Sequence, residues 1–201
     1  MFKVYGDIYS GNCYKVKLLM TQLDIEHTWE PLEVVGGDTR SAEFLAMNPN
    51  GKIPLLEFPD GTHLPESGAI LWYLAEGSAL LPAERLAHAR VLQWMFFEQY
   101  SHEPYIAVAR FMVRYLRQAE THKEVLADKH QRGYRALDVM EDHLREHEFF
   151  VDAYSIADIM LYAYTHVADE GNMSLQDYPN VRAWLERVQA QPRHITMAEG
   201  G

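Results

Sequence analysis

Residues 50–58 read NGKIPLLEF, and this stretch decides how the first part of the chain folds. Ile53, Leu55 and Leu56 give it the composition of a short buried strand. Pro54 stands at its head, and proline is confined to edges, first positions and bulges because it cannot donate to a sheet ladder. The stretch therefore predicts either a turn that starts a strand or a main chain shaped to hold an extended ligand.

Outward from this stretch, strand and helix patterns alternate up to about residue 80. Strands are expected at 2–6, 25–34, 54–58 and 62–66, and helices at 13–23, 41–49 and 67–77. The first two strands are joined through a helix and should be parallel. The last two flank the turn sequence Pro-Asp-Gly at 59–61 and should be antiparallel. The expected order is βαβαββα.

Only helical patterns follow residue 84. Helices are expected at 84–117, with a bend at Pro104, and at 121–147, 155–171 and 178–192. Residues from Arg193 onwards carry no helix or strand pattern and are expected to be frayed. We therefore predict an α/β domain at 1–79 and an all-helical domain at 84–201.

Charge and composition restrict the partners of the chain. Its 201 residues carry 18 Lys+Arg against 29 Asp+Glu, a net charge of −11, with no basic patch. This excess repels phosphate backbones and anionic lipid, so we expect neither a nucleic-acid nor a membrane partner. The N-terminus lacks the pattern of a signal peptide. Cys13 is the single cysteine, so no internal disulfide forms, which is compatible with the cytoplasmic location that we expect.

No metal site is expected. His143 and His147 are spaced as helical metal ligands are, but no third ligand is near and the His-Glu-x-x-His order is absent. We interpret both as surface histidines.

Four stretches carry a resemblance to a known family: YSGNCYKVKLLM at 9–20, NPNGKIPLLEF at 48–58, LPESGAILWYLAE at 64–76 and SIADIMLYAY at 155–164. In this order and at these separations, they resemble the glutathione S-transferase family over essentially the whole chain. The resemblance implies a thioredoxin-like N-terminal domain, a helical C-terminal domain, a glutathione site in the cleft between them, and a homodimer.

The resemblance also assigns the residues that bind glutathione. In the family the residue at Pro54 is a cis proline, a form that costs only ~0.5–1 kcal/mol at X-Pro bonds although only ~5–6% of them adopt it. The main chain of Ile53 would then pair with the cysteinyl part of glutathione. Lys52 is either a cation for a carboxylate of glutathione or a solvated loop lysine. Ser67 would hold the γ-glutamyl carboxylate and Glu66 the α-ammonium, whereas the plainer alternative makes Ser67 a helix N-cap.

The chemistry is expected at Ser10, between the first strand and the first helix, where related folds carry Cys-x-x-Cys. A hydroxyl there can donate a hydrogen bond to the sulfur of glutathione, and Asn12 is a second candidate donor. Tyr5 is interpreted as a packing residue. Cys13 stands three positions after Ser10 and is interpreted as a buried, inert thiol.

The second domain supplies weaker candidates. Tyr105, Arg110 and Phe111 are expected to line the site of an electrophilic second substrate. Ser155 and Asp158 fit a variant of the capping box, and we assign them no catalytic role.

The interpretation is a glutathione transferase that adds the glutathione thiolate to a small, electrophilic, partly apolar substrate. A glutathione-dependent disulfide reductase, in which two bound glutathiones do the redox work, is the first alternative: some bacterial members of the family combine a serine or threonine with an asparagine at this site, as Ser10 and Asn12 do here. A non-catalytic binding or assembly module of the same fold is the second.

Overall fold

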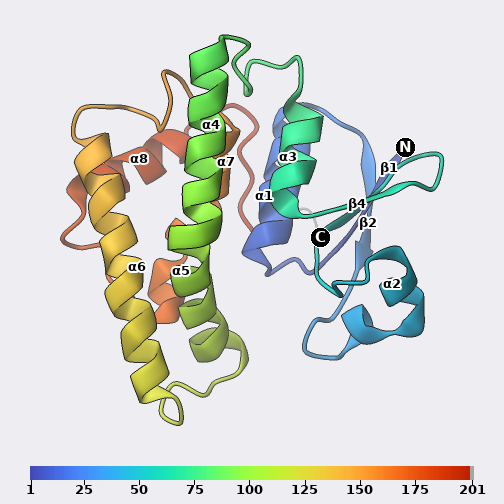
Figure 1. Cartoon of the computed structure of the whole chain (residues 1–201), viewed down its shortest axis with the longest axis horizontal. Helices are drawn as coiled ribbons and strands as arrows, with labels where there is room; N and C mark the ends of the chain where they lie inside the picture. Colours follow the sequence, from blue (N-terminus) through green and yellow to red (C-terminus); the bar gives the residue numbers. More distant parts are fainter. Residues whose placement is uncertain (200–201) are drawn as a thin grey trace. The chain divides into compact units, whose positions relative to one another are not determined.

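The computed structural model describes residues 1–199, and the chain forms two compact units (Figure 1). The α/β unit comprises Met1–Ser78 together with the segment that begins at Pro192, and the helical unit comprises Ala79–Gln191. The sequence had placed that C-terminal segment in the helical domain instead. Among the described residues, no helix combines the length and the apolar character needed to cross a membrane.

The α/β unit is built on a four-stranded sheet of β1 (Phe2–Gly6), β2 (His27–Pro31), β3 (Leu55–Glu57) and β4 (His63–Pro65). The strand order is β2-β1-β3-β4. β1 and β2 are parallel, whereas β3 runs antiparallel to both β1 and β4. The predicted pairing is confirmed.

The sheet separates two sets of helices. α1 (Gly11–Gln22) and α3 (Ser67–Ala75) pack against each other on one side, while the short η1 (Asp38–Arg40) and α2 (Ala42–Met47) lie on the other (Figure 1). Side chains of a strand alternate between the two faces. Val4 therefore points into the core beneath α1 and α3, and residues 3 and 5 point toward α2.

The C-terminal segment packs on the α/β unit through α1. The hydroxyl of Tyr14 donates to the main-chain oxygen of Ile195 at 2.6 Å, and Arg193 pairs with Asp24 at 2.9 Å. The expectation that this segment is frayed is wrong up to Glu199. A tail held by single side-chain contacts leaves no periodic pattern in the sequence.

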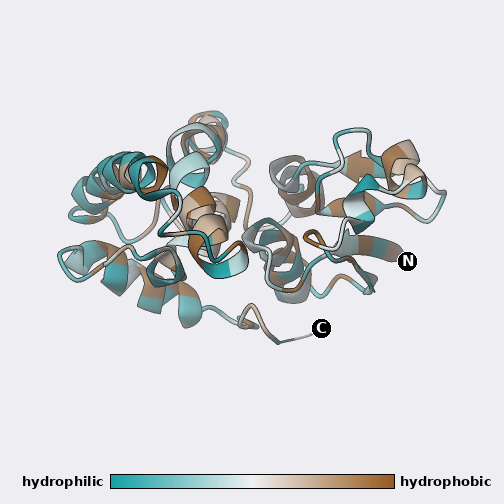
Figure 2. Ribbon diagram, turned by 90° about the horizontal axis from the view of Figure 1, so that it is seen from below, coloured by the Kyte–Doolittle hydropathy of each residue, from teal (hydrophilic) through white to brown (hydrophobic). Residues whose placement is uncertain are grey.

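The helical unit contains α4 (Arg85–Phe97), η2 (Glu98–His102), α5 (Glu103–Arg110), η3 (Phe111–Tyr115), α6 (Lys123–Leu144), α7 (Ile156–Thr165), η4 (Ala168–Gly171) and α8 (Pro179–Gln189). Polar and apolar residues alternate around individual helices, as expected where one side is buried (Figure 2). The single helix expected at 84–117 is instead α4 and α5, joined by the π-helical turn η2 and followed by the π-helical turn η3. Pro104 lies in the first turn of α5, directly after η2, where the wider turn accommodates its missing N–H.

Asp158 anchors the start of α7 from a fully buried position. Its carboxylate accepts from the N–H of Ser155 at 2.9 Å and from that of Phe150 at 3.2 Å. Trp184 of α8 donates its indole N–H to the same carboxylate at 2.9 Å. The predicted capping box is confirmed. Burial raises the pKa of Asp158 to about 6, although these donors oppose the rise.

We expect Asp158→Ala to lower the free energy of unfolding by about 3 kcal/mol, because it removes the cap and leaves buried donors without an acceptor. Urea denaturation measures the loss. Asp152→Ala is the control, since the Asp152 carboxylate is 77% exposed and lies 3.8 Å from Arg90. Equal losses for the two variants would contradict the structural role of Asp158.

His143 is half-buried within a group of aromatic rings, whereas His147 is exposed. Its ring stacks on His147 with centroids 4.2 Å apart and on Phe150 at 5.5 Å, and Trp94 lies edge-on at 4.8 Å. Burial, with a smaller contribution from His147, lowers the pKa of His143. The interpretation as a surface residue therefore holds for His147 and is wrong for His143.

The lowered pKa predicts a loss of stability in acid. The contribution of His143 is complete above the unfolded pKa of about 6.5 and falls as the pH drops through the folded value. We expect the melting temperature of His143→Phe to fall less between pH 7.5 and 5 than that of the wild type. His122→Gln alters an exposed histidine and should follow the wild type. A melting temperature that falls as much with pH in His143→Phe as in the wild type would contradict the lowered pKa of His143.

Candidate functional site

Asn48 organises the loop that leads into β3. Its side chain is 3% exposed, and its amide donates to the main-chain oxygen of Lys52 at 2.7 Å. Its carbonyl oxygen accepts from the N–H of Asn50 at 3.2 Å, and its main-chain oxygen accepts from that of Gly51 at 2.9 Å. A single buried residue thus fixes the path of the chain up to Ile53.

Ile53 presents its main chain at the end of this loop. Among residues 1–199, nothing pairs with its N–H or its C=O. The Ile53–Pro54 peptide bond is cis, and Pro54 is buried. Leu55, two residues on, is already paired in the sheet with Tyr5 and Pro65. Unpaired main chain next to a strand of a sheet can hold an extended peptide by backbone hydrogen bonds.

The N-terminus of α3 differs in one detail from the sequence-based interpretation. Glu66 is the N-cap residue, with φ +72° and ψ 113°, and no side chain caps the helix. Ser67 is the first residue of α3, is 5% exposed, and donates its hydroxyl to Oδ1 of Asn12 at 3.4 Å. The plain capping alternative for Ser67 is therefore wrong. A positive φ at a residue other than glycine is uncommon and occurs preferentially at functional positions.

Glu66 also contacts the loop before β3. Asn50 donates its side-chain amide to Oε1 of Glu66 at 3.5 Å. The side chain of Lys52 is exposed. The structure therefore brings Glu66 and the 48–53 loop together and leaves Lys52 at the surface beside them.

The N-terminus of α1 carries the expected sulfur-binding residues. Ser10 is its N-cap, and its hydroxyl accepts from the N–H of Cys13 at 3.4 Å. Asn12 lies in the first turn and contacts Ser67 of α3, so the two helix N-termini meet at this side chain. Cys13 is fully buried, and burial raises the pKa of its thiol to about 12. Cys13 therefore stays protonated near neutral pH.

The three candidates of the helical unit do not share one environment. Arg110 is 3% exposed and donates to Glu170 at 2.7 Å, while Arg114 donates to the same carboxylate at 3.0 Å. Phe111 stacks on Tyr115 with centroids 5.5 Å apart.

Tyr105 instead faces α6. Lys129 and Arg132 lie over its ring at 5.3 and 5.7 Å. A role of these residues in binding an electrophile stays a prediction, and Arg110 already has a structural ion pair.

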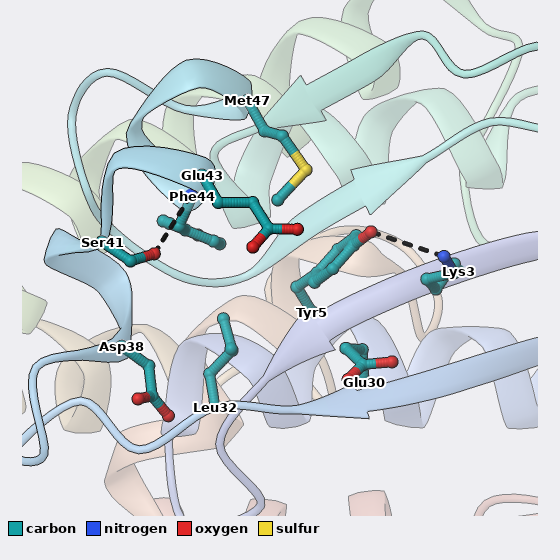
Figure 3. A pocket seen from close by; sticks show the side chains of 9 residues that line it. All are labelled: Lys3, Tyr5, Glu30, Leu32, Asp38, Ser41, Glu43, Phe44 and Met47. Carbon is teal, nitrogen blue, oxygen red and sulfur yellow. Dashed lines mark hydrogen bonds between the residues drawn. The ribbon is translucent and has the colours of Figure 1, made fainter.

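Tyr5 lies in a hollow of about 430 Å³ between the sheet and α2 (Figure 3). Its hydroxyl donates to Glu57 at 2.5 Å, and Lys3 donates to that hydroxyl at 3.4 Å. The hollow is lined by none of the residues predicted to bind glutathione; its lining is Lys3, Tyr5, Glu30, Leu32, Asp38, Ser41, Glu43, Phe44 and Met47. Tyr5 is half-buried, its ring lies 6.4 Å from that of Phe44 and its hydroxyl is paired with Glu57, and its interpretation as a packing residue stays a prediction.

Two residues of the site were missed by the sequence analysis. Asn48 gives only the signal of an Asn-Pro dipeptide, which indicates a turn. Lys15 is 0% exposed and donates its ammonium to Oδ1 of Asn12 at 2.7 Å. A lysine among helical residues is ordinarily read as solvated, so composition could not identify it.

Two family models match the chain. Residues 9–76 match the model "Glutathione S-transferase, N-terminal domain", and residues 87–192 match "Glutathione S-transferase, C-terminal domain". Together they span most of both units.

Individual relatives agree with the family models. A glutathione S-transferase crystal structure from Pseudomonas fluorescens Pf-5 is 56% identical, with a TM-score of 0.97 over 98% of this chain and 99% of that one. Glutathione S-transferase 3 of Zea mays is 30% identical over 94% of this chain and 90% of its own. A glutathione transferase from Burkholderia graminis, with two glutathione molecules bound per subunit, is 28% identical with a TM-score of 0.83 over 96% and 85%.

Gly51 allows a sharp test of the loop. Its φ is +62°, and a Cβ there would lie 2.9 Å from the main-chain oxygen of Thr39 and 2.7 Å from the guanidinium of Arg40. We expect Gly51→Ala to lower the free energy of unfolding by about 2–3 kcal/mol, through the left-handed backbone and the clash. The change is measured by urea denaturation.

Gly61→Ala is the matched control, because Gly61 has φ +84° and a Cβ added there would meet no atom within 4 Å. Gly61→Ala should lower the free energy of unfolding by only about 1 kcal/mol, which is the cost of the left-handed backbone alone. If Gly51→Ala lost no more free energy of unfolding than Gly61→Ala, the added Cβ would cost nothing beyond the backbone term, and the close packing of the loop at Gly51 would be contradicted.

Proposed function

The chain belongs to the glutathione S-transferase family, and we propose that it binds glutathione and adds the glutathione thiolate to a small, electrophilic, partly apolar substrate. The observation that carries the proposal is the unpaired main chain of Ile53, in the same unit as the linked side chains of Asn12 and Ser67. A tripeptide needs backbone partners for its middle and charged or polar partners at its two ends. The α/β unit supplies all three kinds.

The middle of glutathione is assigned to Ile53. Its N–H and C=O can exchange two hydrogen bonds with the cysteinyl residue, as in strand addition. This pairing fixes the direction of the tripeptide, because its γ-glutamyl and glycyl ends then lie on opposite sides of the cysteine.

The γ-glutamyl end is assigned to Glu66 and Ser67. The first N–H groups of α3 have no partner within the helix, and the helix dipole favours a carboxylate there. Glu66 supplies the opposite charge for the α-ammonium. The exposed ammonium of Lys52 is assigned to the glycyl carboxylate.

The sulfur is assigned to Ser10, with Asn12 as a second donor. A thiol of pKa ~8.5 is only a few per cent ionised at pH 7. For half of it to be ionised at this pH, its pKa must fall by ~1.5 units, which corresponds to ~2 kcal/mol. A helix N-terminus contributes ~0.3–1 kcal/mol. A hydrogen bond to a charged group adds ~1.5–3 kcal/mol. The hydroxyl and the helix together reach the required value, whereas the helix dipole alone does not.

In the transfer, the thiolate attacks the electrophilic carbon of the second substrate and forms a carbon–sulfur bond. In a substitution, the leaving group departs with the electron pair of the broken bond. In an addition, the π bond of an activated double bond breaks instead, and the carbanion that results takes a proton from water. The protein lowers the barrier by holding the sulfur ionised and placed. Tyr105, Arg110 and Phe111 are assigned to the binding of the electrophile. The protein is proposed to act as a homodimer in the cytoplasm.

Disulfide reduction is the second candidate. The two glutathione molecules bound per subunit of the Burkholderia graminis relative favour it. One thiolate would attack the disulfide and release a thiol; the second would attack the mixed disulfide, giving a second thiol and glutathione disulfide. Turnover of 2-hydroxyethyl disulfide against that of a chloronitrobenzene separates the two activities. Failure to bind a glutathione column would instead favour a non-catalytic module.

We expect Ser10→Ala to raise the pKa of bound glutathione by at least 1 unit and to lower kcat/KM by 10- to 100-fold, since the main donor to the thiolate is lost. Thiolate absorbance of bound glutathione, titrated against pH, measures the shift. Ser41→Ala is the control, because Ser41 likewise caps a helix, accepting from the N–H of Phe44 at 3.2 Å. A wild-type complex whose thiol ionises as in free glutathione would contradict the mechanism.

A further inference from the structure

Lys15 is a buried cation that the proposed mechanism does not use. It lies on α1, one turn after Asn12, and is 0% exposed. Removing an ammonium from water is unfavourable unless the charge is paired or hydrogen-bonded. Its Nζ donates to Oδ1 of Asn12 at 2.7 Å, a short, charge-assisted hydrogen bond. A long apolar side chain would fill the same place without this penalty.

The bond to Lys15 fixes which way the Asn12 amide faces. The two ends of an asparagine amide are alike in shape, and their assignment normally depends on the surrounding hydrogen bonds. An ammonium is a donor only, so it must meet the oxygen and not the NH₂ group. Ser67 donates its hydroxyl to the same oxygen at 3.4 Å. The amide oxygen is therefore held from α1 and from α3, and the NH₂ group is turned away from Lys15.

This orientation matters for the sulfur. Asn12 lies in the first turn of α1, two residues after Ser10, and of the two ends of its side-chain amide only the NH₂ group can donate to an anion. Hydrogen bonds in series also polarise one another, so an amide whose oxygen accepts from an ammonium is a stronger donor at its nitrogen.

We propose that Lys15 is a positioning residue, which acts through Asn12 to turn and strengthen the amide donor for the glutathione thiolate. The inference deepens the proposed function and depends on it for the thiolate. Its structural part, the orientation of Asn12, does not depend on glutathione. Because Ser67 shares the same oxygen, the γ-glutamyl end and the sulfur end of the site are joined through one side chain.

The test compares Lys15→Met with Lys17→Met. Lys17 stands on the same helix and is 3% exposed, but its ammonium lies 5.2 Å over the ring of Trp29 and has no hydrogen-bond partner in the described part of the chain. Both substitutions replace a buried ammonium by an apolar chain of similar length. A purely structural effect of charge removal should therefore appear in both variants.

We expect Lys15→Met to raise the pKa of bound glutathione by about 1 unit and to lower kcat/KM about tenfold, with a near-constant dissociation constant for glutathione. Lys17→Met should change none of these. In an Asn12→Ala background, Lys15→Met should produce no further shift. A shift of the same size in that background would mean that the charge acts directly, and would overturn the positioning role.

A second readout uses the protein without glutathione. The side-chain NH₂ resonances of Asn12, assigned by their loss in Asn12→Ala, should move in Lys15→Met and stay in place in Lys17→Met. Unmoved resonances would overturn the inference whatever the activity. If the wild-type protein instead leaves the pKa of glutathione unshifted while these resonances respond as expected, the proposed function fails and the orientation of Asn12 by Lys15 stands.

Discussion

Within two residues, the main chain must change from unpaired at Ile53 to paired on both sides at Leu55. Leu55 must be paired on both sides because β3 lies between β1 and β4. Ile53 must stay unpaired if its main chain is to bind the proposed ligand. Pro54 stands between them and has no N–H to satisfy, and the buried amide of Asn48 fixes the approach of the chain. A backbone left unpaired in this way is stable only where water or a peptide completes it.

Around this point, the two helices of the α/β unit place their N-termini together. The contact between Ser67 and Asn12 joins α3 to α1, so one positive helix end can meet a carboxylate while the other meets a sulfur. The helix dipole alone does not ionise a thiol enough. In the proposed site, the hydroxyl of Ser10, the helix dipole and the Asn12 amide would each contribute a fraction, and their sum would depend on their relative placement. The buried ammonium of Lys15, hydrogen-bonded to Asn12, is inferred to set the direction of that amide.

Periodicity predicted the elements of both units, because apolar spacing records burial against a neighbouring face. The parallel pairing of β1 with β2 and the antiparallel pairing of β3 with β4 followed from the connections, whereas Ser10 and Glu66 were assigned through the resemblance to the family. Burial of Lys15 was not predictable, since a lysine reads as solvated whatever surrounds it. The π-helical turns around α5 were missed because one extra residue in a turn barely changes the apolar pattern. The packed C-terminal segment depends on Tyr14, far away in sequence.

The central claim is that the main chain of Ile53 binds the cysteinyl part of glutathione. Amide hydrogen exchange at Ile53, followed by NMR with and without saturating glutathione, tests it most directly. The account predicts fast exchange in the free protein, because this N–H is unpaired, and a slowing of at least tenfold in the complex. An Ile53 amide that exchanges equally fast in both states, while other amides of the α/β unit respond to glutathione, would contradict the account.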